Sequence, residues 1–172
     1  MIIDKFNETI DIWLNALDSF TLKQLLIKPN EKSWSLGQLY CHIIDESKWY
    51  NKQIRISLLD KENSNIATTE KTRILMDRGS FEDIMIKGDP LISENIKQPR
   101  SINNLKSELE KLKKSTNEIW ATMNSLSSHG KSKHPGMGYM TCFEWLRYSE
   151  MHMRHHLKQK ERIQKFLLEI TF

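Results

Sequence analysis

The sequence predicts an all-α fold, a four-helix up-and-down bundle with a long connection between its second and third helices. Apolar residues recur three or four positions apart in four long stretches, which is the spacing of one buried helical face. These stretches contain no proline, and most of the glycines lie in the segments between them. With 172 residues and 38% hydrophobic content, the chain can bury a continuous core, so we expect residues 1–172 to form a single domain.

The first helix is expected from about Asp4 to Leu26, a length of about six turns. Pro29 and Asn30 end the pattern and predict a short connection. The apolar positions of this helix are Phe6, Ile10, Trp13, Leu17, Phe20 and Leu25.

A capping box marks the beginning of the second helix. Ser35 can cap the free amides of the first turn, and Gln38 follows three residues later. The helix is expected to continue to about Leu59. His42 lies two turns into it, on the flank of the apolar stripe, so its imidazole can face the inside of the bundle.

The periodicity fails from Asp60 to Arg100, and about forty residues is long for a connection inside one domain. We expect a short helix there from about Phe81 to Ile86, with Ser80 as its cap. Two interpretations stay open for this segment: a mobile connector, or a cover that lies across one side or mouth of the bundle.

The third helix has the most regular pattern, begins after a Ser101 cap and ends near Leu126. A loop rich in glycine and proline follows, and we interpret His129 and His134 as surface residues of this loop. The fourth helix is expected from the capping box of Thr141 and Glu144 to about Leu168.

Composition argues against several kinds of partner. The 26 basic residues are interspersed with 22 acidic ones, so the net charge of +4 forms no basic stripe, and we expect no nucleic acid as partner. No signal peptide or apolar run of membrane-spanning length is present, and the two cysteines, Cys41 and Cys142, cannot form a disulfide framework. We therefore expect a cytoplasmic protein with reduced thiols and no membrane partner. Its oligomeric state stays open, with a homodimer as one alternative.

Near the end of the chain, His152 and His156 are one helical turn apart and so share a face. His155 should point about a quarter-turn away from them. Together with His42, these two residues can bring three imidazoles to one point between two helices, which leaves a metal coordination position open, as in catalytic sites. The competing interpretation is a group of hydrogen-bonded core histidines.

Several familiar metal and nucleotide sites are excluded. No histidine follows a glutamate at the three-residue spacing of di-iron bundles. A zincin motif would need glutamate at position 153, which is Met153. The glycine-rich motifs of dinucleotide and P-loop binding do not occur.

Two segments carry a family resemblance: Trp34-Ser-Leu-Gly-Gln-Leu-Tyr-Cys-His42 and, about a hundred residues later, His152-Met-Arg-His-His156-Leu-Lys-Gln159. Together they resemble the signature of the DinB/YfiT-like superfamily of metalloenzymes, over essentially the whole chain. The resemblance implies that His42, His152 and His156 bind a divalent metal. Characterised relatives include transferases and isomerases that use bacillithiol, mycothiol or related low-molecular-weight thiols, and many members have no known activity.

The expected cofactor is one divalent ion, zinc or nickel first and iron or manganese as alternatives, together with a low-molecular-weight thiol. The leading hypothesis is a metal-dependent, bacillithiol-type thiol S-transferase whose partners are the thiol and a small-molecule electrophile. A hydrolase that uses a metal-activated water is the alternative, and a non-catalytic, metal-stabilised stress or binding protein is a third. Glu46, one turn beyond His42, is the candidate catalytic base or partner of an imidazole, against the alternative of a solvated carboxylate. Tyr148 and Gln159 are further candidates for the wall of the site.

Overall fold

The computed structural model describes residues 1–59, 61, 63–81 and 95–170. Four long helices form a bundle in which each helix packs against two others, in the cyclic order α1, α7, α3, α6. Their bounds are Ile2–Ala16 for α1, Leu36–Leu59 for α3, Ile102–Ser125 for α6 and Cys142–Glu169 for α7. The four-helix bundle with a long connection between its second and third helices is therefore confirmed.

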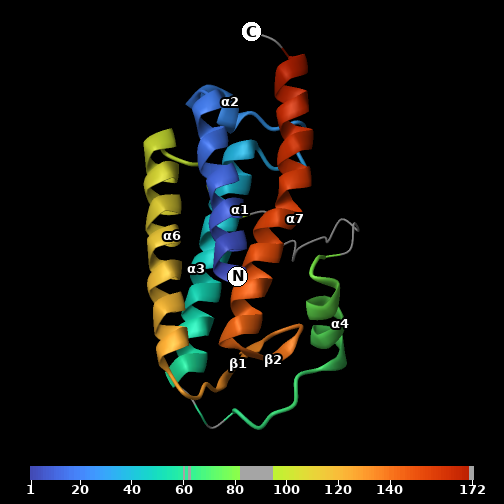
Figure 1. Cartoon of the computed structure of the whole chain (residues 1–172). Helices are drawn as coiled ribbons and strands as arrows, with labels where there is room; N and C mark the ends of the chain where they lie inside the picture. Colours follow the sequence, from blue (N-terminus) through green and yellow to red (C-terminus); the bar gives the residue numbers. More distant parts are fainter. Residues whose placement is uncertain (60, 62, 82–94, 171–172) are drawn as a thin grey trace.

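The directions of the helices follow from the path of that connection. In Figure 1, α1 and α7 run one way along the bundle and α3 and α6 run the other way. Side-chain pairs agree, because Lys48 bonds Glu108 and Asn51 bonds Thr116, so residue numbers rise together along α3 and α6. The order is thus up, down, down, up, and not the alternating up-and-down order expected from the sequence. The physical reason is the long connection, which returns the chain to the end of the bundle at which α3 begins, so that α6 runs parallel to α3.

The expectation of one continuous helix from Asp4 to Leu26 is wrong. The helix α1 ends at Ala16, a 3₁₀ turn covers Leu17–Ser19, and a separate short helix, α2, covers Leu22–Leu26. The break lies at Phe20, whose backbone is extended. Its cause is local, because Thr21 and Gln24 form a capping box that begins a new helix.

The predicted capping box of α3 is present and also holds the segment that leads into α6. The amide of Gln38 donates to Oγ of Ser35, and the amide of Ser35 donates to Oε1 of Gln38, both at 3.1 Å. The side chain of Gln38 donates to the carbonyl of Ile96, and the hydroxyl of Ser35 donates to Gln98, each at 2.7 Å. These bonds fix residues 95–98 beside the first turns of α3, which precede His42 on that helix.

The connection contains a helix that the sequence pattern did not indicate. This helix, α4, covers Glu70–Arg78, begins at a Thr69 cap and ends at Gly79, whose φ of 67° is a left-handed conformation. In Figure 1, α4 lies beside the lower half of α7. The short helix expected from Phe81 to Ile86 falls mostly on residues outside the described part of the chain.

The glycine- and proline-rich stretch before α7 is a β-hairpin, although a loop was expected. Strands β1 (Lys131–His134) and β2 (Gly138–Thr141) pair in antiparallel fashion. Its turn is held against α4, because Thr69 and Thr72 both donate to the carbonyl of Met137, at 2.8 and 2.7 Å.

The predicted beginnings of α6 and α7 are confirmed. Ser101 caps α6, and Thr141 and Glu144 form the capping box of α7. The core between the four helices is rich in aromatic residues, with Phe6, Trp13, Tyr40 and Trp145 fully buried. Within the described residues, no helix is both long enough and apolar enough to cross a membrane.

Candidate metal centre

Two facing rows of side chains build the site. On α3, His42, Glu46 and Tyr50 follow one another at intervals of one turn, and on α7 the same interval separates Tyr148, His152 and His156. The two helices run in opposite directions. The histidines therefore meet at one end of the paired rows and the tyrosines at the other, with ring centroids of Tyr50 and Tyr148 5.4 Å apart.

The structure brings together the three histidines that the sequence indicated. Nε2 of His156 lies 3.2 Å from Nε2 of His42 and 3.2 Å from Nε2 of His152. One nitrogen from each ring lies within 4.8 Å of the other two. Two imidazole nitrogens bound to one tetrahedral zinc-like ion, each at about 2.0–2.1 Å, are about 3.3 Å apart. The two short spacings therefore suit a shared ion.

Burial keeps these imidazoles neutral. It lowers the pKa of His42 to about 3, with the nearby His156 as a second cause. It also lowers the pKa of His156 to about 4 and moves the pKa of His152 well below its ordinary value. At neutral pH all three rings thus carry the lone pair that a metal ligand needs.

A hydrogen bond at the second ring nitrogen of His156 sets the orientation of this ring. Nδ1 of His156 lies 3.0 Å from Oε1 of Gln159, which can only accept, so this ring carries its proton on Nδ1 and its lone pair on Nε2. That single lone pair faces the Nε2 atoms of both other rings, whereas one lone pair can fully accept only one hydrogen bond. Nδ1 of His152 is buried and has no hydrogen-bond partner within the described residues. The donor set therefore fits one ion better than a set of mutually hydrogen-bonded core histidines.

Glu46 is half-buried, and its Oε2 accepts a hydrogen bond of 2.9 Å from the hydroxyl of Tyr50. Burial, and then the charge of Glu46, raises the pKa of Tyr50 far above its ordinary range, and the same two causes raise the pKa of Tyr148 to about 12. Both phenols stay protonated, and the Tyr50 hydroxyl donates its hydrogen bond to a carboxylate.

A pocket of about 530 Å³ adjoins the cluster at His42, on the α3 side. His42 and Glu46 form part of its wall, and the segment fixed beside the start of α3 forms the opposite wall. The remaining lining residues are Cys41, Asp45, Asn95, Ile96 and Lys97. Burial, with the nearby Asp45, raises the pKa of the Cys41 thiol to about 11, so this thiol stays protonated.

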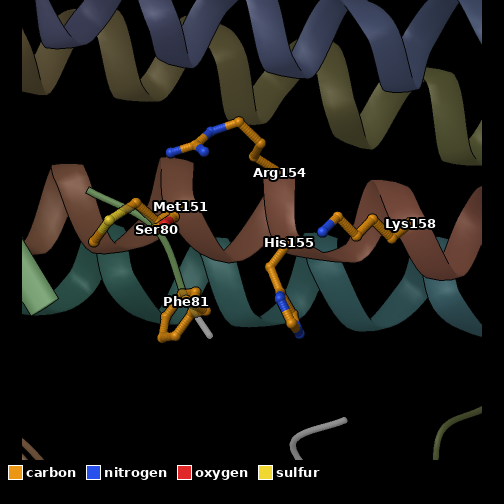
Figure 2. A pocket seen from close by; sticks show the side chains of 6 residues that line it. All are labelled: Ser80, Phe81, Met151, Arg154, His155 and Lys158. Atoms are coloured by element: carbon orange, nitrogen blue, oxygen red, sulfur yellow. The ribbon is translucent and has the colours of Figure 1, made fainter. Parts of the chain in front are cut away.

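A second pocket, of about 330 Å³, lies on the α7 side (Figure 2). Its lining includes His155, whose ring lies beside that of Phe81 at a centroid distance of 5.6 Å. His155 is not among the three clustered histidines, in agreement with the helical register expected for α7. Phe81 also lies near His152, with ring centroids 6.4 Å apart, so this aromatic ring stands between the second pocket and the cluster.

The interpretation of His134 as a surface residue is wrong. Its ring is half-buried in the hairpin and packs against Trp145 and Tyr148 at centroid distances of 5.3 and 5.0 Å. Burial, and then Lys71, lowers its pKa to about 4. His129 is half-buried as well, and its Nε2 lies 2.8 Å from the carbonyl of Met123 at the end of α6. Neither residue belongs to the three-histidine cluster.

Sequence reasoning also missed Tyr50 as a partner of the site. The spacing of four residues between Glu46 and Tyr50 on one helix could have indicated the contact, because side chains at this spacing lie one above the other.

Comparisons with known proteins identify a family and a similar fold. The profile of the DinB superfamily matches residues 5–159. Among solved structures, one described as "YfiT from Bacillus subtilis is a probable metal-dependent hydrolase with an unusual four-helix bundle topology" is similar, with a TM-score of 0.63 and 16% identity. The alignment covers 96% of this chain and 85% of that chain, and it establishes the likeness of the folds. No curated protein sequence matches significantly. Because the profile covers most of its length, the chain belongs to the DinB superfamily.

Proposed function

We propose that this protein is a metal-dependent S-transferase that joins a low-molecular-weight thiol, of the bacillithiol type, to a small-molecule electrophile. One observation carries the proposal: three neutral imidazoles converge from two helices, and one of them, that of His42, lines a pocket of about 530 Å³. Three protein ligands leave at least one coordination position for an exogenous group, which is the arrangement of catalytic rather than structural sites.

His42, His152 and His156 would hold the ion, with zinc or nickel favoured by three imidazole ligands and iron or manganese as alternatives. Such an ion supplies a Lewis acid that stabilises the thiolate form of a thiol. Gln159 keeps the His156 ring in the tautomer that points its lone pair into the cluster.

Glu46 would act as the general base for the thiol, because its carboxylate lines the same pocket as His42. The S–H proton passes to the carboxylate and the electron pair stays on sulfur. The sulfur then forms a bond to the electrophilic carbon, and the leaving group departs with the electron pair of its own bond. The preference for a thiol over water rests on the superfamily's thiol-dependent members.

A second candidate is a metal-dependent hydrolase, the activity given as probable for the structurally similar YfiT. In that case the ion, held by the same three histidines, would supply a Lewis acid that lowers the pKa of a water molecule toward about 7, and Glu46 would be the acceptor of the proton. A non-catalytic, metal-stabilised binding protein is the third candidate. It would lose stability on chelation and show no exchangeable coordination position.

The deciding experiment uses cobalt-substituted protein. A thiol that enters the coordination sphere produces thiolate-to-cobalt charge-transfer absorption, and conjugation of that thiol to 1-chloro-2,4-dinitrobenzene should then depend on metal and on His42. The His42→Ala variant is the test of the centre, and His129→Ala, far from the cluster, is the matched control.

A panel of thiols that leaves the cobalt spectrum unchanged and yields no conjugate would overturn the transferase. Ester or amide hydrolysis that rises through an apparent pKa near about 7 without thiol would then support the hydrolase. Absence of both activities, with a loss of stability on chelation, would leave the metal-stabilised binding protein.

A further inference from the structure

The hydrogen bond between Tyr50 and Glu46 connects the buried interface of α3 and α7 to the pocket. We propose that Tyr50 is a positioning residue, which fixes the carboxylate of Glu46 so that its second oxygen faces the nucleophile in the pocket. The inference rests on the proposed function, since it assigns Tyr50 a part in the proton transfer that Glu46 performs there.

The first support is the rigidity of Tyr50. Its side chain is 2% exposed, and its ring packs edge-on against Trp49, Tyr148 and His152 at centroid distances of 5.5, 5.4 and 5.6 Å. A phenol enclosed in this way has one direction in which its hydroxyl can donate. That direction is taken by Oε2 of Glu46, at 2.9 Å.

The second support is the difference in burial between Glu46 and Tyr50. Glu46 is half-buried and lines the pocket beside His42, whereas Tyr50 is buried behind it. A glutamate on a helix surface ordinarily samples several rotamers, and a base that samples several positions spends little time in the productive one. A hydrogen bond from a fixed donor to one carboxylate oxygen removes that freedom and leaves the other oxygen, Oε1, to take the proton.

The transfer that Tyr50 would assist is simple to balance. The S–H bond of the thiol breaks, an O–H bond forms at Oε1 of Glu46, and the electron pair remains on sulfur. Glu46 then passes this proton to solvent, which restores the carboxylate, so that Glu46 acts as a catalyst of the transfer. A group that speeds such a transfer changes the rates of both directions equally. Loss of the Tyr50 hydroxyl should therefore slow thiolate formation and leave the equilibrium affinity for the thiol unchanged.

The test uses cobalt-loaded protein, with 2-mercaptoethanol as the probe and the charge-transfer band followed by stopped flow. We expect Glu46→Gln to slow growth of the band about a hundredfold, the usual share of a general base, and Tyr50→Phe to slow it about tenfold. The thiol concentration at half-saturation should stay within about twofold in both variants, because only the rates change. In the Glu46→Gln background, Tyr50→Phe should have no further effect, since Tyr50 acts only through that carboxylate.

Tyr40→Phe is the matched control. Tyr40 lies on the same helix, is 0% exposed, and its hydroxyl donates a hydrogen bond of the same length, 2.9 Å, to the carbonyl of Trp13. It should lower stability as Tyr50→Phe does and leave the rate of band growth unchanged. Equal slowing by both variants, or slowing by Tyr50→Phe that persists in the Glu46→Gln background, would overturn the proposal.

A second readout needs no thiol. In zinc-loaded protein with ¹³C-labelled glutamate, the Glu46 carboxyl resonance is assigned by its loss in Glu46→Gln. It should move or broaden in Tyr50→Phe and stay in place in Tyr40→Phe. An unchanged resonance in Tyr50→Phe would overturn the positioning role. The two proposals can also fail separately. If the wild-type protein binds no thiol, but the Glu46 resonance still shifts in Tyr50→Phe, the proposed S-transferase would be refuted and the positioning of Glu46 by Tyr50 would stand.

Discussion

The metal-free protein should be unusually sensitive to acid, because its candidate ligands are buried as neutral imidazoles. Burial lowers the pKa of His42 to about 3 and that of His156 to about 4, and it places the pKa of His152 well below its ordinary value. In the unfolded chain, each of these residues should titrate near about 6.5. A histidine whose pKa is lowered in the folded state takes up its proton only on unfolding. Its contribution to stability is therefore complete above the pKa of the unfolded chain, about 6.5. The contribution is lost as pH falls toward the pKa of the folded state.

The size of the effect follows from these shifts. Each pH unit below about 6.5 costs about 1.4 kcal/mol for one such histidine, so the three together cost about 4 kcal/mol per unit. At about pH 4.5 the summed loss reaches about 8 kcal/mol, which is comparable with the whole stability of a typical domain, about 5–15 kcal/mol. The metal-free protein is therefore expected to unfold between about pH 5 and pH 4.

Urea denaturation in the presence of EDTA, followed by far-UV circular dichroism at a series of pH values, measures this slope directly. The free energy of unfolding should fall with a slope that corresponds to uptake of about four protons between about pH 6 and pH 5, three by the clustered histidines and one by His134, whose pKa burial also lowers to about 4. The His42→Gln variant should lower the slope by about one proton. A wild-type slope below about one proton would refute the reasoning, because the imidazoles would then be protonated in the folded protein.

Single substitutions should separate the parts of the metal centre and its supports. By elemental analysis, His155→Ala should keep about one divalent ion per chain and His156→Ala should lose it; the opposite pattern would contradict the helical register of α7. Gln159→Leu removes the acceptor of the His156 Nδ1 proton, so competition with a chelator should show metal affinity about 10–100-fold weaker, and unchanged affinity would deny it an orienting role. In Gly37→Ala, the new Cβ would lie 2.7 Å from the proline ring ahead of α6, which should lower thermal stability by about 1–3 kcal/mol. Gly136→Ala, whose nearest neighbouring atoms are 3.9 Å away, is the control, and equal melting temperatures would contradict the close approach at Gly37.

The sequence was most informative where structure depends on neighbouring residues. The capping boxes at Ser35 and Thr141 correctly located the beginnings of α3 and α7. A similar box at Thr21 was overlooked, because the apolar spacing of the first helix continues through Phe20 and conceals the break. Periodicity reports which face is buried, whereas the cap decides where a helix begins.

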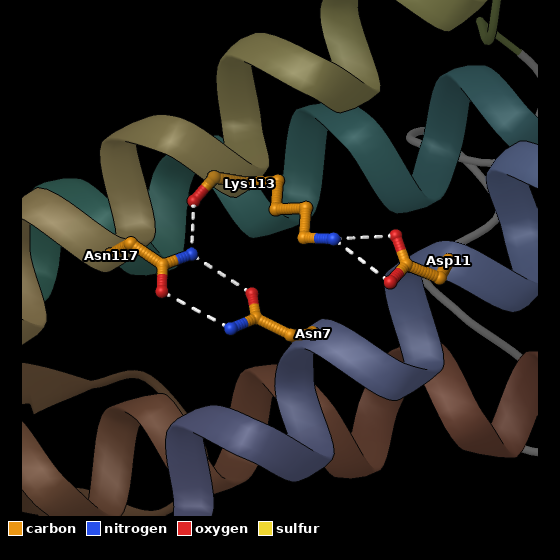
Figure 3. Close-up of polar contacts among 4 residues, drawn as sticks. All are labelled: Asn7, Asp11, Lys113 and Asn117. Atoms are coloured by element: carbon orange, nitrogen blue, oxygen red, sulfur yellow. Dashed lines mark hydrogen bonds and ion pairs between the residues drawn. The ribbon is translucent and has the colours of Figure 1, made fainter.

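Which helices become neighbours could not be read from the pattern of any single helix. Asn7 of α1 and Asn117 of α6 exchange two amide hydrogen bonds, of 3.1 and 2.8 Å, and Lys113 pairs with both carboxylate oxygens of Asp11 (Figure 3). These contacts fix an antiparallel register between α1 and α6. Their residues are separated by about a hundred positions, so nothing in either helix alone indicates the partner.

The same limit explains the error at His134. Its surroundings are made by α3 and α7, against which the hairpin packs, and by α4, which holds the hairpin turn through Thr69 and Thr72. A segment rich in glycine and proline indicates a turn, but its burial depends on what the rest of the chain packs against it. The cluster of three histidines could nevertheless be predicted, because two of them share one helical face and the third lies on the flank of an apolar stripe.

The histidine centre carries a local cost that an ion at the Nε2 atoms would not remove but whose effect on the fold its binding would counter. Nδ1 of His152 is buried without a hydrogen-bond partner in the described part of the chain, and such a group costs about 1–3 kcal/mol. An ion binds the neutral form of all three rings, which burial maintains in the folded protein well below about pH 6.5, so its binding should add to the stability of the fold there. At one hundred times its dissociation constant, it would contribute about 2.7 kcal/mol, about a third of the loss expected on acidification. The residues that make the metal-free fold sensitive to acid are thus the ones through which a metal stabilises it, and addition of zinc should shift the acid unfolding midpoint to lower pH.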